Sequence, residues 1–190
     1  MKGFSYLLLT TSPREEWKPG PILFKEAFDL AVRFRASHIV RPPLSVPILL
    51  VGRIVASDSN NKAMGGATQY PGCGDDSFDA RRKELSQDFP RVDFSRGWIA
   101  VSSDALRTVL SRGEKEGKFW LAEVIHHELI HFCSQLGHDE DGGLCWRLDI
   151  LFTKRLGRSF QVPEDCLIPF LLGKERELAY WSTRQRRAAR

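Results

Sequence analysis

The chain has 190 residues, 42% of them hydrophobic and 27% charged, with a formal net charge of +4. The length fits one domain, or one domain with a tail, and the composition is that of an ordinary globular protein. No apolar stretch is long enough to cross a bilayer and no internal repeat is visible, which argues against membrane proteins and repeat arrays. The apolar run from Tyr6 to Leu9 is too short for a signal-peptide core, so we expect a cytoplasmic protein with no membrane partner. Export without a cleaved signal stays open.

The first half of the chain predicts one helix and two strands around a long irregular segment. Residues 21–36 begin with proline and place apolar side chains on one face, which predicts a helix. Residues 46–55 and 97–101 are rich in β-branched side chains and predict strands. Residues 57–96 are rich in Gly, Asp, Ser and Asn and lack strong periodicity. A connection of this length is uncommon in a compact domain, so short strands, disorder and an active-site rim all stay open.

Two helices are predicted next. Residues 102–110 begin with a serine cap followed by an acidic residue, which is typical of a helix start. Residues 113–117 predict a charged turn. Residues 119–136 give the clearest helix, because apolar side chains recur every three or four positions. Gly137 suits the C-terminal cap of that helix.

The C-terminal part predicts three further helices and a basic tail. The helices are expected over residues 144–156, 163–172 and 175–187. Four side chains of the first one, Leu148, Leu151, Phe152 and Leu156, are expected to face the core. Residues 184–190 hold four arginines, a pattern that attracts nucleic acid by charge, although a solvated terminus is the simpler alternative. We therefore expect one domain over residues 1–183 and a basic tail over 184–190.

A metal-site motif lies on the helix predicted for residues 119–136. His127 and His131 are four positions apart, so both imidazoles lie on one side of that helix, off its apolar stripe. Two neutral imidazoles in this arrangement can bind one zinc ion. Glu128 directly follows His127 and is placed to act as general base on a water molecule at the metal. The alternative is a pair of histidines with no metal.

A catalytic zinc ion usually has a third protein ligand. His138 is the first candidate, because it follows Gly137, where the chain can turn back towards the metal. Glu140, Asp141 and Asp149 are its rivals, since zinc also accepts carboxylates.

The sequence also gives expectations for a further histidine and for the cysteines. His126 is expected either to support the ligands from behind or to be exposed. The four cysteines form no C-x-x-C pair, so a zinc ribbon is not indicated. Cys133 and Cys145 are expected to pack as small apolar side chains rather than to bind metal.

Three segments within residues 92–156 resemble the SprT-like family of metallopeptidases. They are the strand 99–102, the helix 121–131 and the segment 141–146. In the family the last segment reads Gly-His-Gly before an aromatic residue. Here that histidine is absent between Gly142 and Gly143, and His138 is placed to replace it.

The resemblance implies an α+β, zincin-like fold in which a small sheet, including strands near Ile48 and Ile99, packs on the H-E-x-x-H helix. It implies zinc-dependent hydrolysis of peptide bonds, with a protein or peptide substrate and DNA-bound proteins as targets. It also implies that Ile99 to Val101 form the edge strand to which a substrate adds. Two other functions stay open: a nucleic-acid- or partner-binding module whose zinc is structural or lost, and hydrolysis of a non-peptide amide.

Overall fold

The computed structural model describes residues 5–10, 20–33, 45–55, 63–72, 77–137 and 144–158. The chain forms two compact units, Met1–Gln135 and Leu136–Arg190. The helices expected over 163–172 and 175–187 and the basic tail over 184–190 lie outside the described residues. The expected boundary between a domain and a tail therefore stays a prediction.

The first unit is built on a four-stranded mixed sheet. Its strands, in order across the sheet, are β1 (Tyr6–Thr10), β2 (Val46–Val51), β6 (Trp98–Ser102) and β5 (Gly66–Gln69). β1 pairs with β2 and β2 with β6 in parallel, whereas β5 pairs with β6 antiparallel. Parallel strands inside a sheet are covered on both faces. This explains why β2 is an almost uninterrupted apolar run. The strands predicted near Ile48 and Ile99 are confirmed as β2 and β6.

The segment 57–96 contains regular structure. Short strands, one of the alternatives left open, are present as β4 (Ala63–Met64) and β5, and α2 (Ser77–Asp88) follows them. The helix was not predicted because its two buried apolar side chains, Phe78 and Leu85, are two turns apart among polar residues. β1 was also not predicted as a strand, because a run of five residues carries little periodicity of its own.

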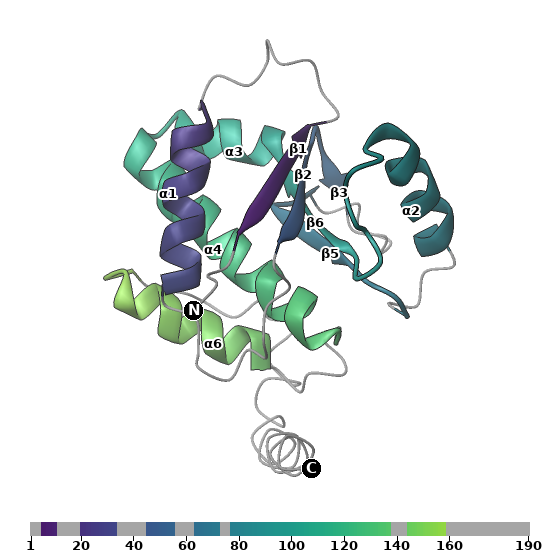
Figure 1. Ribbon diagram of the computed structural model, residues 1–190. Coiled ribbons are helices and arrows are strands. Elements are labelled where there is room, and N and C mark those ends of the chain that lie inside the picture. Colours follow the sequence, from purple (N-terminus) through teal and green to yellow (C-terminus); the bar gives the residue numbers. More distant parts are fainter. Residues whose placement is uncertain are drawn as a thin grey trace. The chain divides into compact units, whose positions relative to one another are not determined.

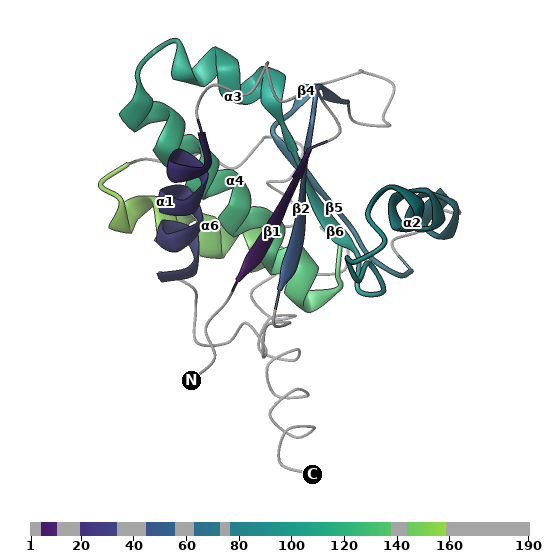
Figure 2. The ribbon, with the colours of Figure 1, turned by 45° about the horizontal axis from the view of Figure 1, so that its top comes forward.

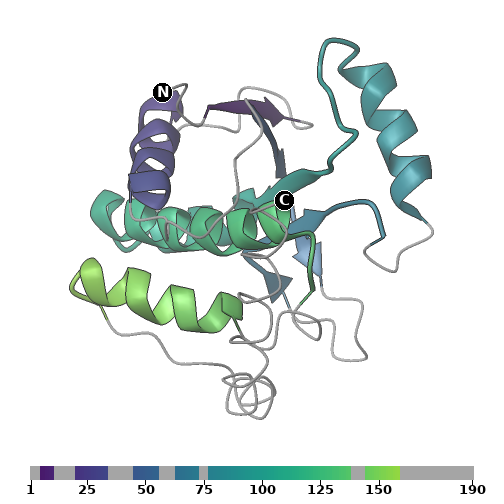
Figure 3. The ribbon, with the colours of Figure 1, turned by 60° about the horizontal axis from the view of Figure 1, so that its bottom comes forward.

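Helices cover both faces of this sheet (Figures 1 and 2). α1 (Gly20–Arg33) and α4 (Glu114–Ser134) lie on one face, and α2 lies on the other, as a third view also shows (Figure 3). On the α1 side, the ring of Tyr6 in β1 packs against Phe24 and Phe28, with centroid distances of 5.6 and 4.4 Å. The expected mixture of helices with a small sheet packed on the H-E-x-x-H helix is therefore confirmed.

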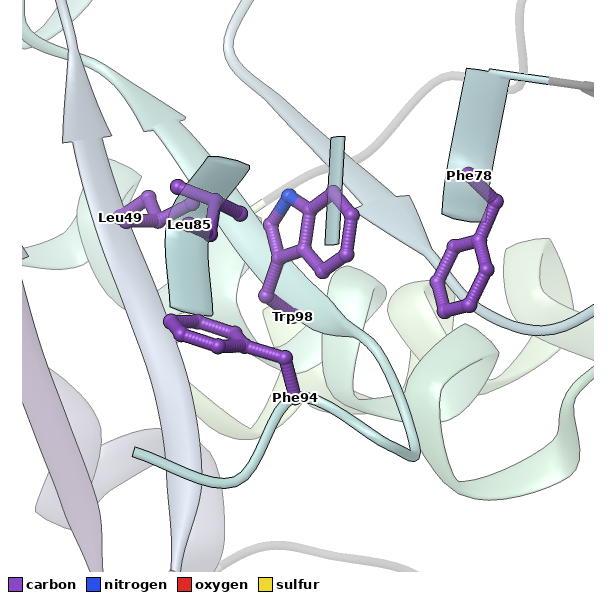
Figure 4. Packing of buried hydrophobic residues seen from close by; sticks show 5 residues of the cluster. All are labelled: Leu49, Phe78, Leu85, Phe94 and Trp98. Atoms are coloured by element: carbon purple, nitrogen blue, oxygen red, sulfur yellow. The ribbon is translucent and has the colours of Figure 1, made fainter. Parts of the chain in front are cut away.

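The α2 face carries a cluster of buried apolar side chains (Figure 4). Its members are Leu49, Phe78, Leu85, Phe94 and Trp98. The ring of Trp98 stacks on Phe78 with centroids 5.3 Å apart and meets Phe94 edge-on at 6.0 Å. Aromatic contacts of this kind add to the stabilisation that comes from area burial.

α3 (Ser103–Leu110) follows β6 directly, as predicted. The hydroxyl oxygen of Ser102 accepts the backbone N–H of Ala105 at 3.2 Å, which is the expected serine cap. The same hydroxyl donates to the carbonyl oxygen of Gly52 at 3.2 Å. Gly52 leads into β3 (Ile54–Val55), which pairs antiparallel with β4. One side chain therefore ties the start of α3 to the end of β2.

α4 is longer at its start and shorter at its end than predicted. It begins at Glu114, so most of the turn expected over 113–117 is helical. Apolar periodicity begins only near Phe119, which is why the first turn was not predicted. The helix ends at Ser134, and Gln135 is its left-handed cap, with φ 57° and its N–H donating to the carbonyl oxygen of His131 at 2.8 Å. The prediction of Gly137 as the cap is wrong, because the chain already leaves the helix two residues earlier.

The second unit contains α6 (Leu144–Arg155), in agreement with the helix predicted over 144–156. Phe152 is buried as expected, but Leu151 is 56% exposed, so its prediction as a core residue is wrong. The hydroxyl of Thr153 donates to the carbonyl oxygen of Asp149 within the helix. No helix in the described part of the chain has the length and apolar character needed to cross a membrane.

Candidate metal and catalytic site

α4 holds the two histidines of the motif side by side. Its apolar stripe is buried, which fixes how the helix is rotated about its own axis against the rest of the unit. The imidazole rings of His127 and His131 have centroids 4.9 Å apart and planes at 70° to each other. His131 is buried at 6% exposure, and His127 is partly exposed. One helical turn therefore brings both rings together with one of them reachable from solvent.

Glu128 is buried and contacts the sheet. Its side chain is 6% exposed. The hydroxyl of Thr68, on β5, lies 2.7 Å from the Glu128 carboxylate oxygen Oε2 and 3.0 Å from the Glu128 carbonyl oxygen. A buried carboxylate must replace its lost hydration with hydrogen bonds. Thr68 supplies one of them from a residue sixty positions away in the sequence.

A pair of glycines lets β5 approach α4 closely. A Cβ atom on Gly66 would lie 2.7 Å from Val124 Cγ1 and 2.9 Å from Glu128 Cγ, and a Cβ atom on Gly65 would lie 2.7 Å from the Trp120 ring. Real Cβ atoms essentially never make contacts this short. The backbone of β5 therefore packs directly on the side of α4 that carries Glu128, because these positions have no side chains.

The edge strand beside α4 is β5. Ile99 to Val101 were expected at the edge, but β6 lies between β2 and β5. The edge prediction is wrong because β5 comes from the segment 57–96, where no strand could be placed from sequence. Among the described strands, β5 pairs with β6 alone, so its other edge faces away from the sheet.

His126 is buried at 2% exposure, so the alternative of an exposed helix residue is wrong. Cys133 is buried as well and forms no disulfide. The two residues are seven positions apart, so their side chains lie on one side of α4. The role of His126 in supporting the ligands stays a prediction.

Three of the four third-ligand candidates, His138, Glu140 and Asp141, lie outside the described residues. The fourth, Asp149, is on α6 in the second unit and is buried at 5% exposure. Its role as a ligand stays a prediction.

Within the first unit, the paired imidazoles of His127 and His131 could supply two donor atoms to a metal ion. Cys145, on α6 of the second unit, is fully buried and forms no disulfide. Its burial fits the prediction that this thiol packs as a small apolar side chain.

The donor type of the paired imidazoles fits a first-row transition metal. Imidazole nitrogen is a ligand that zinc takes often, and it also suits other metals of the row. The donors therefore support a metal ion without identifying which one. Thr68 and Gly66 were missed by sequence reasoning, and the only signal for them was the glycine pair at 65–66 in an otherwise uncharacterised segment.

Comparisons with protein-family models, curated proteins and solved structures found no match for this chain. The likeness to SprT-like metallopeptidases therefore stays a prediction that rests on the residues themselves.

Proposed function

We propose that this protein is a zinc-dependent metallopeptidase. The observation that carries the proposal is the geometry of one turn of α4, where the centroids of two imidazole rings lie 4.9 Å apart and Glu128, the residue after His127, is buried. Two imidazoles supply metal ligands, and a neighbouring carboxylate supplies a base. The Glu128 carboxylate also accepts a hydrogen bond from Thr68 at 2.7 Å, which anchors the proposed base to β5.

Each group has a defined part in the reaction. His127 and His131 would hold the ion through their ring nitrogens. A bound zinc ion supplies Lewis acidity, which activates water and polarises a carbonyl group. Glu128 would accept the proton of the attacking water and deliver it to the amine that leaves, so that the peptide bond breaks with proton balance.

The substrate would be an extended protein or peptide segment beside β5. Main-chain hydrogen bonds to a strand edge bind peptides with little dependence on sequence. The edge of β5 with which no described strand pairs belongs to the strand whose Thr68 contacts Glu128. Proteins bound to nucleic acid are the targets that the SprT-like resemblance implies, and the basic residues 184–190 would favour such targets by charge.

The test compares Glu128→Gln with the wild-type protein. Cleavage is measured on a library of quenched fluorescent peptides and on labelled casein, and zinc content is measured by elemental analysis. We expect Glu128→Gln to keep its zinc and to lose at least about a hundredfold in turnover, because a general base alone contributes about 10²–10⁴-fold. Glu114→Gln, the same substitution at an exposed position of α4, is the matched control and should leave turnover unchanged.

Three results would contradict the proposal. Equal turnover of Glu128→Gln and wild type excludes Glu128 as the base. Zinc in stoichiometric amount without cleavage of any peptide points to the binding module with a structural site. Cleavage of small amides but of no peptide points to a non-peptide amidase.

The third ligand is decided by metal analysis of single variants. His138→Ala and Asp149→Asn each remove one candidate donor. Loss of a ligand lowers zinc affinity strongly, whereas a packing residue leaves it nearly unchanged. Full zinc occupancy in a variant removes that residue from the ligand set.

A further inference from the structure

We propose that Thr68 is a positioning residue for the catalytic base, and that β5 acts as the seat that orients the Glu128 carboxylate. The inference rests on the proposed function and names a residue to which sequence reasoning assigned no role. It is carried by two contacts that β5 makes with the same side chain from residues two positions apart.

The first contact is the hydrogen bond from Thr68. Its hydroxyl has one proton and two acceptors within reach, the carboxylate oxygen Oε2 of Glu128 at 2.7 Å and the carbonyl oxygen of Glu128 at 3.0 Å. The shorter of the two contacts goes to the carboxylate oxygen rather than to the carbonyl oxygen. The hydroxyl thus contacts both the side chain and the main chain of Glu128. It therefore holds the carboxylate in a defined position relative to α4, the helix that bears the imidazoles.

The second contact is the close packing of Gly66. A Cβ atom at this position would lie 2.9 Å from Glu128 Cγ and 3.0 Å from Oε1. The absence of a side chain at Gly66 therefore leaves the room that the Glu128 side chain occupies. Because side chains alternate along a strand, Gly66 and Thr68 face α4 together. One short strand segment thus packs beside Glu128 at Gly66 and hydrogen-bonds its carboxylate at Thr68.

Orientation of the base has a direct effect on rate. A displacement of about 1 Å in a reacting group can lower turnover about a hundredfold. A glutamate side chain has several rotatable bonds, and only groups locked by neighbours hold a productive geometry. Removing the Thr68 hydroxyl should free the carboxylate to rotate without touching the histidines. Substrate binding and metal binding should therefore survive while the chemical step slows.

The kinetic test uses Thr68→Val, which replaces the hydroxyl with a methyl group of similar shape, and Thr68→Ser, which keeps the hydroxyl. On the best-cleaved peptide of the library, we expect Thr68→Val to lower kcat about ten- to a hundredfold with KM within about twofold. Thr68→Ser should recover most of that loss. Thr108→Val is the control, because its hydroxyl donates to the carbonyl oxygen of Asp104 on α3, away from Glu128.

A second measurement does not depend on turnover. A double-mutant cycle with Thr68→Val and Glu128→Ala is followed by denaturant unfolding of the zinc-free protein. If Thr68 bonds the carboxylate, the two substitutions are non-additive, with a coupling of about tenfold in the unfolding equilibrium constant. Zinc affinity, measured by competition with a chromogenic chelator, should change less than about twofold in Thr68→Val, because the ligands are untouched.

The outcomes separate the two proposals. Full turnover of Thr68→Val in a protein whose Glu128→Gln variant is inactive overturns the positioning role and leaves the peptidase assignment standing. So does a Thr68→Ser variant as slow as Thr68→Val, or additivity in the cycle. Equal turnover of Glu128→Gln and wild type overturns the peptidase assignment, and the positioning role with it.

Discussion

Both faces of the sheet bury apolar side chains, but they differ at β5. On the α2 face, strand side chains such as Leu49 and Trp98 meet Phe78 and Leu85 in an apolar cluster (Figure 4). On the α4 face, β5 presents Gly66 and Thr68, and the carboxylate of Glu128 is buried against them. Both faces are covered by helices, so solvent exposure does not explain the difference.

The difference indicates which side chains stabilise the fold and which carry the proposed reaction. Burial of apolar area stabilises by about 25 cal/mol per Å². A buried carboxylate stabilises little, because its hydrogen bonds mainly offset the hydration that it lost. Apolar burial on both faces can therefore stabilise the sheet, while the polar groups are confined to the β5 end of the α4 face. Substitutions on the two faces should therefore differ in their effects on unfolding free energy and on turnover.

The largest effect is expected from Trp98→Ala on the α2 face. Trp98 is 4% exposed and contacts two aromatic rings. Its removal should lower the free energy of unfolding by about 3–5 kcal/mol, through lost burial and an unfilled cavity. Denaturant unfolding measures the loss. Zinc content and turnover per folded molecule should stay at wild-type values, and a loss of either in the folded variant would show that the faces are not separate.

Gly66→Ala, on the α4 face, should lower turnover as well as stability. The added methyl group would meet Val124 and Glu128 within 3 Å, so the carboxylate or the strand must move. Overpacking should lower stability by about 1–3 kcal/mol. Turnover should fall more than about tenfold, because the proposed base, Glu128, would be displaced.

Gly52→Ala is the matched control for that variant. No heavy atom lies within 4 Å of a Cβ atom at Gly52. Its unfolding free energy should change by less than about 0.5 kcal/mol, the range of an unobstructed site. If both variants behave alike in thermal unfolding and in turnover, close packing at Gly66 has no role in the site.

Ser102→Ala sharpens the comparison at the end of β6. Loss of the cap should lower the free energy of unfolding by about 1 kcal/mol, because the N–H of Ala105 loses its acceptor. Turnover should stay unchanged, since α3 carries no proposed site residue. Ser111→Ala, at the other end of α3, is the control for loss of a serine hydroxyl. Equal losses in the two variants would argue against a specific cap.

The smallest effect is a pH dependence at Asp93, beside the α2-face cluster. The backbone N–H of Ser95 donates to its carboxylate at 2.8 Å, and this hydrogen bond lowers the pKa of Asp93 below 3.8. A carboxyl group whose pKa is lower in the folded state stabilises above its unfolded pKa. That contribution is lost as the pH falls through the folded pKa, so it should disappear below about pH 4.

Because Asp93 is exposed, water and salt screen this contribution to about a few tenths of a kcal/mol. Asp93→Asn should flatten the acid end of the stability curve by that amount, as measured by unfolding from about pH 6 to about pH 2. A steeper acid end in the variant would have the wrong sign and would contradict the assignment.

Local patterns predicted the helices that bury a continuous apolar stripe. α1, α3, α4 and α6 were each found close to their predicted ranges, because helical periodicity repeats within a few residues. α2 was missed, since Phe78 and Leu85 alone define its buried side. The end of α4 was placed too late, because Gln135, a residue that carries no strong cap signal, adopts the left-handed conformation.

What the sequence by itself determined is the spacing of His127, Glu128 and His131. The pitch of an α-helix converts that spacing into neighbouring rings without help from the rest of the chain. Tertiary structure alone decided which strand lies at the edge and that Gly66 and Thr68 face Glu128. The reason is physical: strand order and contacts between residues sixty positions apart depend on pairing between distant segments, which no local periodicity encodes.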